Sequence, residues 1–145
     1  MIWDHIKYFH AGEKWGPASG INGLLIMLLD KIRECWPDSS FVIHCGFESD
    51  GHAKDSQHKT GNAVDFHVQC AMSFAAQIER LEKILKELQV FNRVGLGIYP
   101  TWNNPGFHLD VRGSFARWGR IGDTYVGYAD IIEYVKRQVV EKENA

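Results

Sequence analysis

The chain has 145 residues, of which 45% are hydrophobic and 23% are charged, and its formal net charge is −2. This length suits one globular domain with a real core, so we expect residues 1–145 to form a single domain. The absence of a basic or acidic block argues against a nucleic-acid partner, and no apolar run approaches the roughly 20 residues of a transmembrane helix.

The first residues of the chain lack the apolar stretch of a signal peptide. We therefore expect synthesis in the cytoplasm, and action outside that compartment would need another factor for delivery. The cysteines Cys35, Cys45 and Cys70 are odd in number and fit no paired framework, so we interpret them as reduced thiols. No pattern in the sequence predicts an oligomeric state.

Hydrophobic periodicity predicts a helix and a strand in the first third of the chain. Apolar residues recur at helical spacing over 21–36, with Ser19 as the N-cap and Pro37 at the end. Residues 41–45 are typical of a short strand. The polar, irregular segment 46–61 that follows has the character of a functional loop.

Alternation of apolar and polar residues predicts a second strand over 62–68. Because successive side chains of a strand point to opposite faces, Asp65 and His67 share the polar face. Ser73 is predicted to cap a second helix that runs to about Gln89, with an apolar stripe on one side and charged i,i+4 pairs on the other.

The last third of the chain is predicted to contain two strands and a helix. The strands cover residues 93–99 and 107–111, joined by a turn-rich loop over 100–106. A final helix is expected over 128–141. Strands mixed with segregated helices, without regular βαβ alternation, predict an α+β fold.

Two separated segments contain side chains of the kinds that bind zinc, namely His58 with Asp65 and, far along the chain, His108. Zinc takes imidazole nitrogen and carboxylate oxygen, and a catalytic site keeps a fourth position for water. The spacing by itself leaves an alternative open. In that alternative, His58 is a solvated loop residue, Asp65 a turn acid and His108 a strand residue with an internal partner.

Two ordered motifs resemble a signature of zinc peptidases, Ser56-x-His58-x-x-Gly61-x-Ala63-x-Asp65 and His108-x-Asp110-x-Arg112. With the similar segments 8–16, 29–34 and 95–100, they make most of the chain resemble the D-alanyl-D-alanine carboxypeptidase family (metallopeptidase family fifteen). This family includes phage L-alanyl-D-glutamate endolysins. The best match is to its first subfamily, in which the peptidase is often the C-terminal domain.

The resemblance implies a hedgehog/DD-peptidase fold with a small, mainly antiparallel sheet and helices packed against it. It also implies one zinc ion bound by His58, Asp65 and His108. The implied activity is hydrolysis of an amide bond in the stem peptides of peptidoglycan, by a carboxypeptidase or an endopeptidase. The residues that would contact the substrate are Ser56, Glu48 and Arg112. For Ser56, the alternative is that its side chain caps the loop.

The sequence departs from this family in two places. Many members carry arginine in a Ser-Gly-Tyr-Arg segment, where it pairs with the substrate carboxylate, whereas this chain has Cys45-Gly46-Phe47-Glu48. An acid repels a carboxylate, which predicts poor action on free D-Ala-D-Ala and better cleavage of an internal bond. Some members also place the general base in Glu-x-x-His, where this chain has Pro105.

Asp110 and His67 are the candidate groups for proton transfer. Asp110 lies two residues after His108 on the same strand face, so we predict it as the general base. Its alternative role is to orient a metal ligand or to pair with Arg112. His67 shares a face with Asp65 and is predicted to donate a hydrogen bond to substrate, the alternative being a polar histidine beside the site.

Other functions stay open on the sequence alone. One is a zinc-stabilised binding or phage structural module that kept the fold and lost the base, and another is a metal-free interaction domain. A second, structural zinc site would need His44, Cys45, His52 and Cys70, which lack the usual paired spacing. Three aromatic residues are candidates either for the wall of a cleft that takes a sugar–peptide substrate or for the core: Tyr99, Trp102 and Trp118.

Overall fold

The computed structural model describes residues 2–17, 19–48 and 56–143, and within them the strands form a six-stranded sheet in the order β1-β2-β4-β3-β5-β6. The strands are β1 Ser40–Cys45, β2 Ala63–Gln69, β3 Gly95–Tyr99, β4 Gly106–Asp110, β5 Ala116–Ile121 and β6 Thr124–Val126. Neighbouring strands are antiparallel except for the parallel pair β3 and β5. This mixed sheet with separate helices confirms the predicted α+β class.

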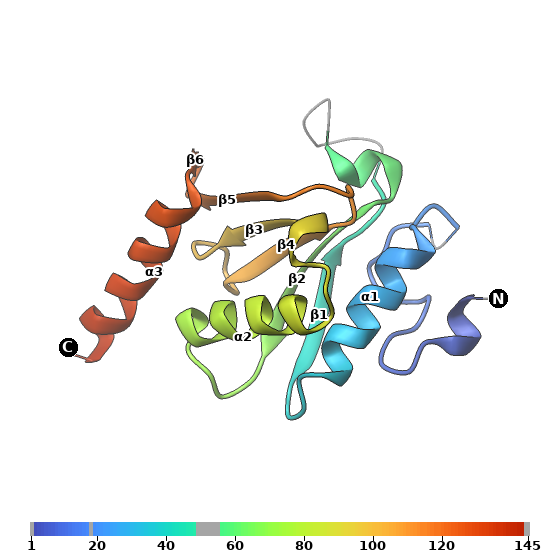
Figure 1. Ribbon diagram of the computed structural model, residues 1–145, viewed down its shortest axis with the longest axis horizontal. Coiled ribbons are helices and arrows are strands. Elements are labelled where there is room, and N and C mark those ends of the chain that lie inside the picture. Colours follow the sequence, from blue (N-terminus) through green and yellow to red (C-terminus); the bar gives the residue numbers. More distant parts are fainter. Residues whose placement is uncertain (1, 18, 49–55, 144–145) are drawn as a thin grey trace.

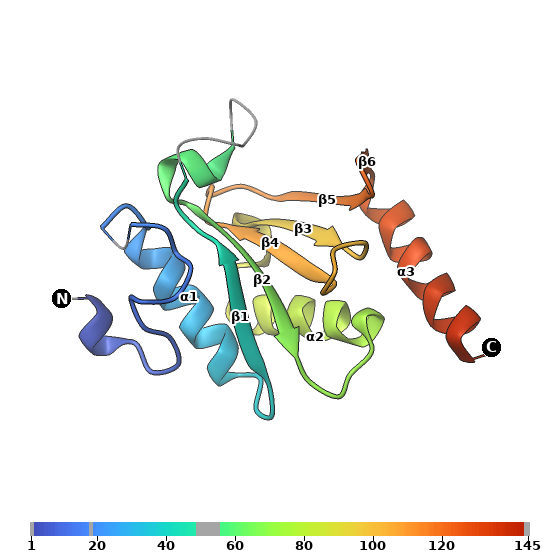
Figure 2. The same ribbon diagram turned by 180° about the vertical axis from the view of Figure 1, so that it is seen from behind.

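The helices of the described residues pack on one side and one end of this sheet. They are α1 Gly23–Glu34, α2 Phe74–Glu87 and α3 Tyr128–Glu143, with 3₁₀ segments η1 Ile2–His5, η2 Gln57–Thr60 and η3 Phe91–Arg93. The two opposite views agree that α1 and α2 lie over the same face of the sheet, while α3 lies beside the end of β5 (Figures 1 and 2). The opposite face of β2 and β4 is therefore left for polar side chains.

Helix ends follow the capping residues of the sequence. Ser73 caps α2 as predicted, since its side chain accepts a hydrogen bond from the Ala76 amide at 3.2 Å. The predicted cap of α1 was wrong: Asn22 rather than Ser19 accepts from the Leu24 amide, at 2.9 Å. Helix α1 consequently begins two residues later than expected, and Leu24 is 69% exposed.

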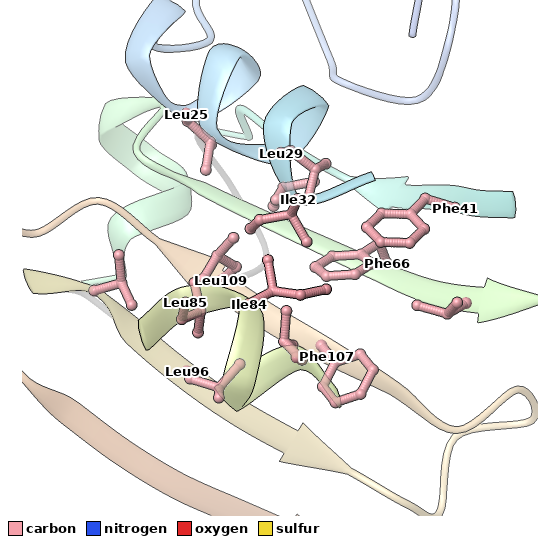
Figure 3. Close-up of a cluster of buried hydrophobic side chains, with 14 of the residues drawn as sticks. Leu25, Leu29, Ile32, Phe41, Phe66, Ile84, Leu85, Leu96, Phe107 and Leu109 are labelled. Atoms are coloured by element: carbon pink, nitrogen blue, oxygen red, sulfur yellow. The ribbon is translucent and has the colours of Figure 1, made fainter. Parts of the chain in front are cut away.

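The core lies between the two central helices and the apolar face of the sheet. Side chains of α1, α2 and the strands point toward one another there, among them Leu25, Leu29, Ile32, Ile84, Leu85, Phe66, Leu96, Phe107 and Leu109 (Figure 3). Burying a side chain of this size contributes about 1.5–3 kcal/mol relative to leaving it exposed. Because this face is filled by apolar contacts, the alternate residues Asp65, His108 and Asp110 point to the other face.

Two strands were absent from the sequence prediction. Residues 116–121 form β5, which pairs in parallel with β3, and residues 124–126 form the short edge strand β6. Most β5 side chains are partly buried, so the segment has no clean alternation of apolar and polar residues. In the described residues, no helix has both the length and the apolar character that a bilayer crossing requires.

Candidate metal centre

Strand register places residues from distant parts of the sequence in one row across the polar face of the sheet. Cys45 of β1 lies opposite Asp65 of β2, Asp65 opposite His108 of β4, and His108 opposite Gly97 of β3. Trp118 of β5 continues the row beside Gly97. Side chains of directly opposed residues lie about 4.5–5.5 Å apart at Cβ, so the row brings a thiol, a carboxylate and an imidazole together.

The three predicted zinc ligands converge on one carboxylate oxygen. His58 Nε2 and His108 Nδ1 each lie 3.1 Å from Asp65 Oδ1, and the two imidazole rings are nearly perpendicular, at 80°, with centroids 5.1 Å apart. Ligand atoms of a tetrahedral zinc site lie about 2.0–2.1 Å from the ion and therefore roughly 3.3 Å from each other. Both distances to Asp65 are close to this value, and the chemistry of the three donors suits a divalent metal ion.

His58 is positioned by the short helix η2 and its caps. Ser56 accepts a hydrogen bond from the His58 amide at 3.2 Å, the loop-capping role that the sequence had offered as an alternative. Gly61 ends η2 with φ 74°, where a Cβ would lie 1.9 Å from the Gly20 carbonyl oxygen, so only glycine fits. The ring Nδ1 lies 2.8 Å from the Gly46 carbonyl oxygen, which leaves Nε2 directed at Asp65.

His108 is oriented by Asp110. The His108 Nε2 atom lies 2.7 Å from Asp110 Oδ2, which leaves Nδ1 directed at Asp65. Asp110 is fully buried and also accepts from Arg112, with Nε 2.8 Å from Oδ1 and Nη2 2.7 Å from Oδ2, and from the Gly95 amide at 3.2 Å. Of the two roles that the sequence left open for Asp110, this geometry fits the orienting one.

The electrostatic environment of Asp110 also fits the orienting role. Burial alone would raise the pKa of the Asp110 carboxyl, but hydrogen bonds from Arg112 and His108 hold that pKa well below its usual range. A carboxylate of depressed pKa, with both oxygens engaged, is a poor acceptor for a proton from water. These partners suit an orienting role, and the role of Asp110 as general base stays a prediction.

Asp65 is charged at neutral pH. Burial would raise its pKa, but hydrogen bonds from His108 and His58 lower the pKa to about 2. Its side chain is 17% exposed, so one part of the carboxylate reaches the surface. A ligand must be deprotonated to bind metal, and Asp65 meets this requirement over the whole physiological range.

A second set of donors overlaps the first. Ligand atoms of Cys45, His58 and Asp65 lie within 4.8 Å of one another, and this group could hold a metal ion. It shares two residues with the predicted set and replaces His108 by Cys45. The sequence analysis treated Cys45 as a reduced thiol, or as part of a separate structural zinc site, and did not include it in this centre.

Cys45 lies near the Nδ1 side of the His58 ring. Cys45 Sγ lies 3.8 Å from His58 Nδ1, the atom already bonded to the Gly46 carbonyl, whereas Nε2 faces Asp65. Burial, a hydrogen bond to Glu48 and the charge of Asp65 raise the pKa of the Cys45 thiol to about 12. A protonated thiol is a weak ligand, but a bound metal ion deprotonates a coordinating thiol, so Cys45 fits the centre as a ligand and His108 as third ligand stays a prediction.

The remaining predicted residues lie around the centre in different ways. His67 stacks on the His44 ring, with centroids 4.7 Å apart, and the two share a short hydrogen bond. Burial and the neighbouring His44 lower the pKa of His67. Glu48 is exposed and accepts from the Cys45 thiol at 3.1 Å. Their contact with substrate, and that of Ser56 and Arg112, stays a prediction.

An aromatic wall borders the His108 side of the centre. The Trp118 ring lies 5.0 Å from that of His108, and its indole nitrogen donates to the Tyr99 hydroxyl at 3.0 Å. Tyr99 in turn stacks on Trp102, with centroids 4.4 Å apart. A Cβ at Gly97 would lie 2.7 Å from the Trp118 ring, so this glycine makes room for the wall. Of the alternatives that the sequence left open, Trp102 lines a pocket, whereas Tyr99 is buried.

Gly95 supports the centre by leaving space for a carboxylate. A Cβ at this position would lie 2.4 Å from Oδ2 and 2.5 Å from Oδ1 of Asp110. We expect Gly95→Ala to lower the free energy of unfolding by about 1–3 kcal/mol, because the buried carboxylate must move. Thermal denaturation checks this, with Gly127→Ala as control, since its Cβ would meet nothing nearer than 3.8 Å. Equal stability of the two variants would contradict the tight contact.

The fold and the site together define an α+β protein with a candidate centre for one metal ion on the polar face of its sheet. No protein-family model, curated protein or solved structure matches this chain. Its function is therefore argued from the geometry of the centre and of the cleft next to it. Of the four residues that a second, structural zinc site would need, His52 lies outside the described residues.

Proposed function

We propose that this chain is a zinc-dependent peptidase of the hedgehog/DD-peptidase fold that hydrolyses an amide bond in peptidoglycan stem peptides. One observation carries the proposal: His58 and His108 direct one nitrogen each at the same oxygen of Asp65, at 3.1 Å. The other nitrogen of each ring has a protein partner as well, the Gly46 carbonyl for His58 and the Asp110 carboxylate for His108. Such second partners orient the ligands of a functional metal site and raise their basicity.

The proposed ligand set has three protein donors, which is the number found in catalytic zinc sites. A zinc ion held there would supply Lewis-acid activation of a water molecule and of the scissile carbonyl. Asp65 contributes the single negative charge, and the two imidazoles are neutral donors. The partly exposed Asp65 carboxylate opens onto a cleft, which gives a substrate access to the centre.

Proton transfer needs a group other than Asp110 in this proposal. Glu48 and His67 are the candidates, because Glu48 contacts the Cys45 thiol beside the centre and His67 lies on the strand face of Asp65. We propose Glu48 as the acceptor, because it contacts the Cys45 thiol beside the centre, whereas the His67 ring is engaged with His44 by stacking and a hydrogen bond. In this scheme Glu48 takes the proton of water and passes it to the leaving amine.

A second candidate function is a zinc-stabilised binding module without catalysis. One observation favours it. The Asp110 carboxylate already accepts hydrogen bonds from Arg112, Gly95 and His108, so it has no position left for the proton of a water molecule. The two functions differ in a simple way. The peptidase cuts its target, and the binding module retains it intact.

The test is a digest of purified peptidoglycan by the zinc-loaded protein, with the products read by mass spectrometry. We expect new peptide ends at one type of bond, and we expect Asp65→Asn to produce none because it removes the charged ligand. Asp123→Asn is the matched control, because its side chain is fully exposed and pairs only with Arg120 at the surface. Intact peptidoglycan with a folded, zinc-loaded protein would reject the peptidase and leave the binding module.

The choice of proton acceptor has its own test. Glu48→Gln is expected to keep zinc and to lose about 10²-fold or more in turnover, the scale of general-base catalysis, whereas His67→Gln should lose less. Zinc content and turnover would be measured on the same preparations. A larger loss in His67→Gln than in Glu48→Gln would reverse the assignment.

A further inference from the structure

A pocket of about 300 Å³ opens beside the candidate metal centre and is lined by His44, Asp65, Trp102, Asn103 and Asn104. The volume is at the lower end of the range for ligand pockets, about 300–1,000 Å³. Asp65 belongs both to this pocket and to the proposed ligand set. A group bound in the pocket would therefore lie directly next to the bond that the proposed peptidase cuts.

The walls of the pocket are held in place by contacts outside it. Trp102 stacks on Tyr99 at an angle of 17°, and Tyr99 is anchored by the hydrogen bond from Trp118. On the other side, His44 stacks on His67 at 24°. The aromatic faces are consequently fixed before any ligand arrives, which lowers the entropic cost of binding.

Two of the residues that line the pocket, Asn103 and Asn104, carry uncharged side-chain amides. The described residues that line it include no lysine or arginine, and their only carboxylate is Asp65. Asn103 and Asn104 are exposed, and each offers one carbonyl acceptor and an NH₂ group with two donors. A free carboxylate would find no lysine or arginine among these residues, whereas an amide finds both a donor and an acceptor together with the flat face of Trp102.

We infer that this pocket is a subsite for an uncharged amide group of the substrate, located beyond the scissile bond. The inference rests on the proposed function and deepens it, because it makes the substrate an extended one cut at an internal bond. Two parts of peptidoglycan have this chemistry, the amides of the continuing stem peptide and the acetamido groups of the glycan. Glu48 stands where many members of the family carry a carboxylate-binding arginine. This acid agrees with the inference, since a negative charge near the centre also disfavours a substrate with a terminal carboxylate.

The test is a binding measurement on zinc-reconstituted protein by NMR, which does not depend on turnover. The probes are a stem tetrapeptide capped by acetyl and amide groups, the same tetrapeptide with a free C-terminal carboxylate, and the N-acetylated glycan disaccharide without peptide. Mass spectrometry after each titration reports whether a probe has been cut, and shifts are compared before any cutting is detected. We expect the capped peptide to shift the side-chain amide signals of Asn103 and Asn104 and the indole signal of Trp102.

A charge substitution gives the specific control. Asn104→Asp is expected to bind the capped peptide about 3- to 10-fold more weakly, because it loses a hydrogen-bond donor to the ligand carbonyl. Asn92→Asp makes the same change at an exposed position on η3 and should bind as the unchanged protein does. Binding of the disaccharide in place of the peptide, with the same loss in Asn104→Asp, would support the amide subsite and assign it to the glycan.

Other outcomes overturn the inference without ambiguity. Tighter binding of the free-carboxylate peptide, equal affinities of Asn104→Asp and Asn92→Asp, or no shift with any probe would each reject the amide subsite. Its failure is distinguishable from failure of the proposed function. Hydrolysis without shifts at these residues rejects only the subsite, whereas shifts without hydrolysis reject only the peptidase.

Discussion

His108→Ala is expected to abolish metal-dependent activity, to lower zinc affinity by at least about 100-fold and to remove the stabilisation that zinc provides. The imidazole is one of three proposed ligands, and binding free energy at such a site is partly folding free energy. The substitution also leaves the buried Asp110 without one partner, which costs about 1–3 kcal/mol. The measurement is thermal denaturation with and without chelator, alongside turnover.

The control for this variant is His10→Ala, which removes an exposed histidine far from the ligands in the sequence. It should retain zinc, activity and the response to chelator. If chelator leaves the melting temperature of the unchanged protein unaltered, and His108→Ala melts at the same temperature, zinc does not contribute to the fold.

Asp110→Asn is expected to weaken zinc binding by about 10- to 100-fold, the usual cost of losing the carboxylate that orients a metal-bound imidazole. The substitution also leaves the half-buried Arg112 guanidinium without its charged partner. We therefore expect the free energy of unfolding to fall by about 3 kcal/mol, the low end for a broken buried pair. Zinc titration and chemical denaturation check the two effects, with Asp123→Asn as the matched surface variant.

This expectation separates the two roles of Asp110. A general base would leave zinc affinity unchanged and lower turnover alone, whereas an orienting carboxylate changes affinity first. Normal zinc affinity with a turnover loss of about 10²-fold would therefore restore the general-base assignment.

Sequence patterns predicted the elements with strong local signals. Helix α2 has a regular apolar stripe and a serine cap, and the alternation in β2 places Asp65 on the polar face, as observed. The motifs also named His58, Asp65 and His108, which the structure brings together. These features depend on residues close in sequence or on a resemblance that covers both segments.

The other features depend on contacts that no local pattern contains. Strand β5 pairs in parallel with β3 and has no alternation of its own. The approach of Cys45 to Asp65 requires the irregularity in β1 between Ile43 and Cys45, which shifts the register by which β1 meets β2. In the same way, alternation placed Asp110 beside His108 but could not show that Arg112 engages both of its oxygens.

The central claim is that His58, Asp65 and His108 bind the metal and that Cys45 does not. Zinc K-edge X-ray absorption of the reconstituted protein tests it directly, because sulfur and nitrogen ligands lie at different distances. We predict a first shell of nitrogen and oxygen atoms only, at about 2.0–2.1 Å from zinc. A sulfur atom at about 2.3 Å would contradict the account and assign the metal to the group of Cys45, His58 and Asp65.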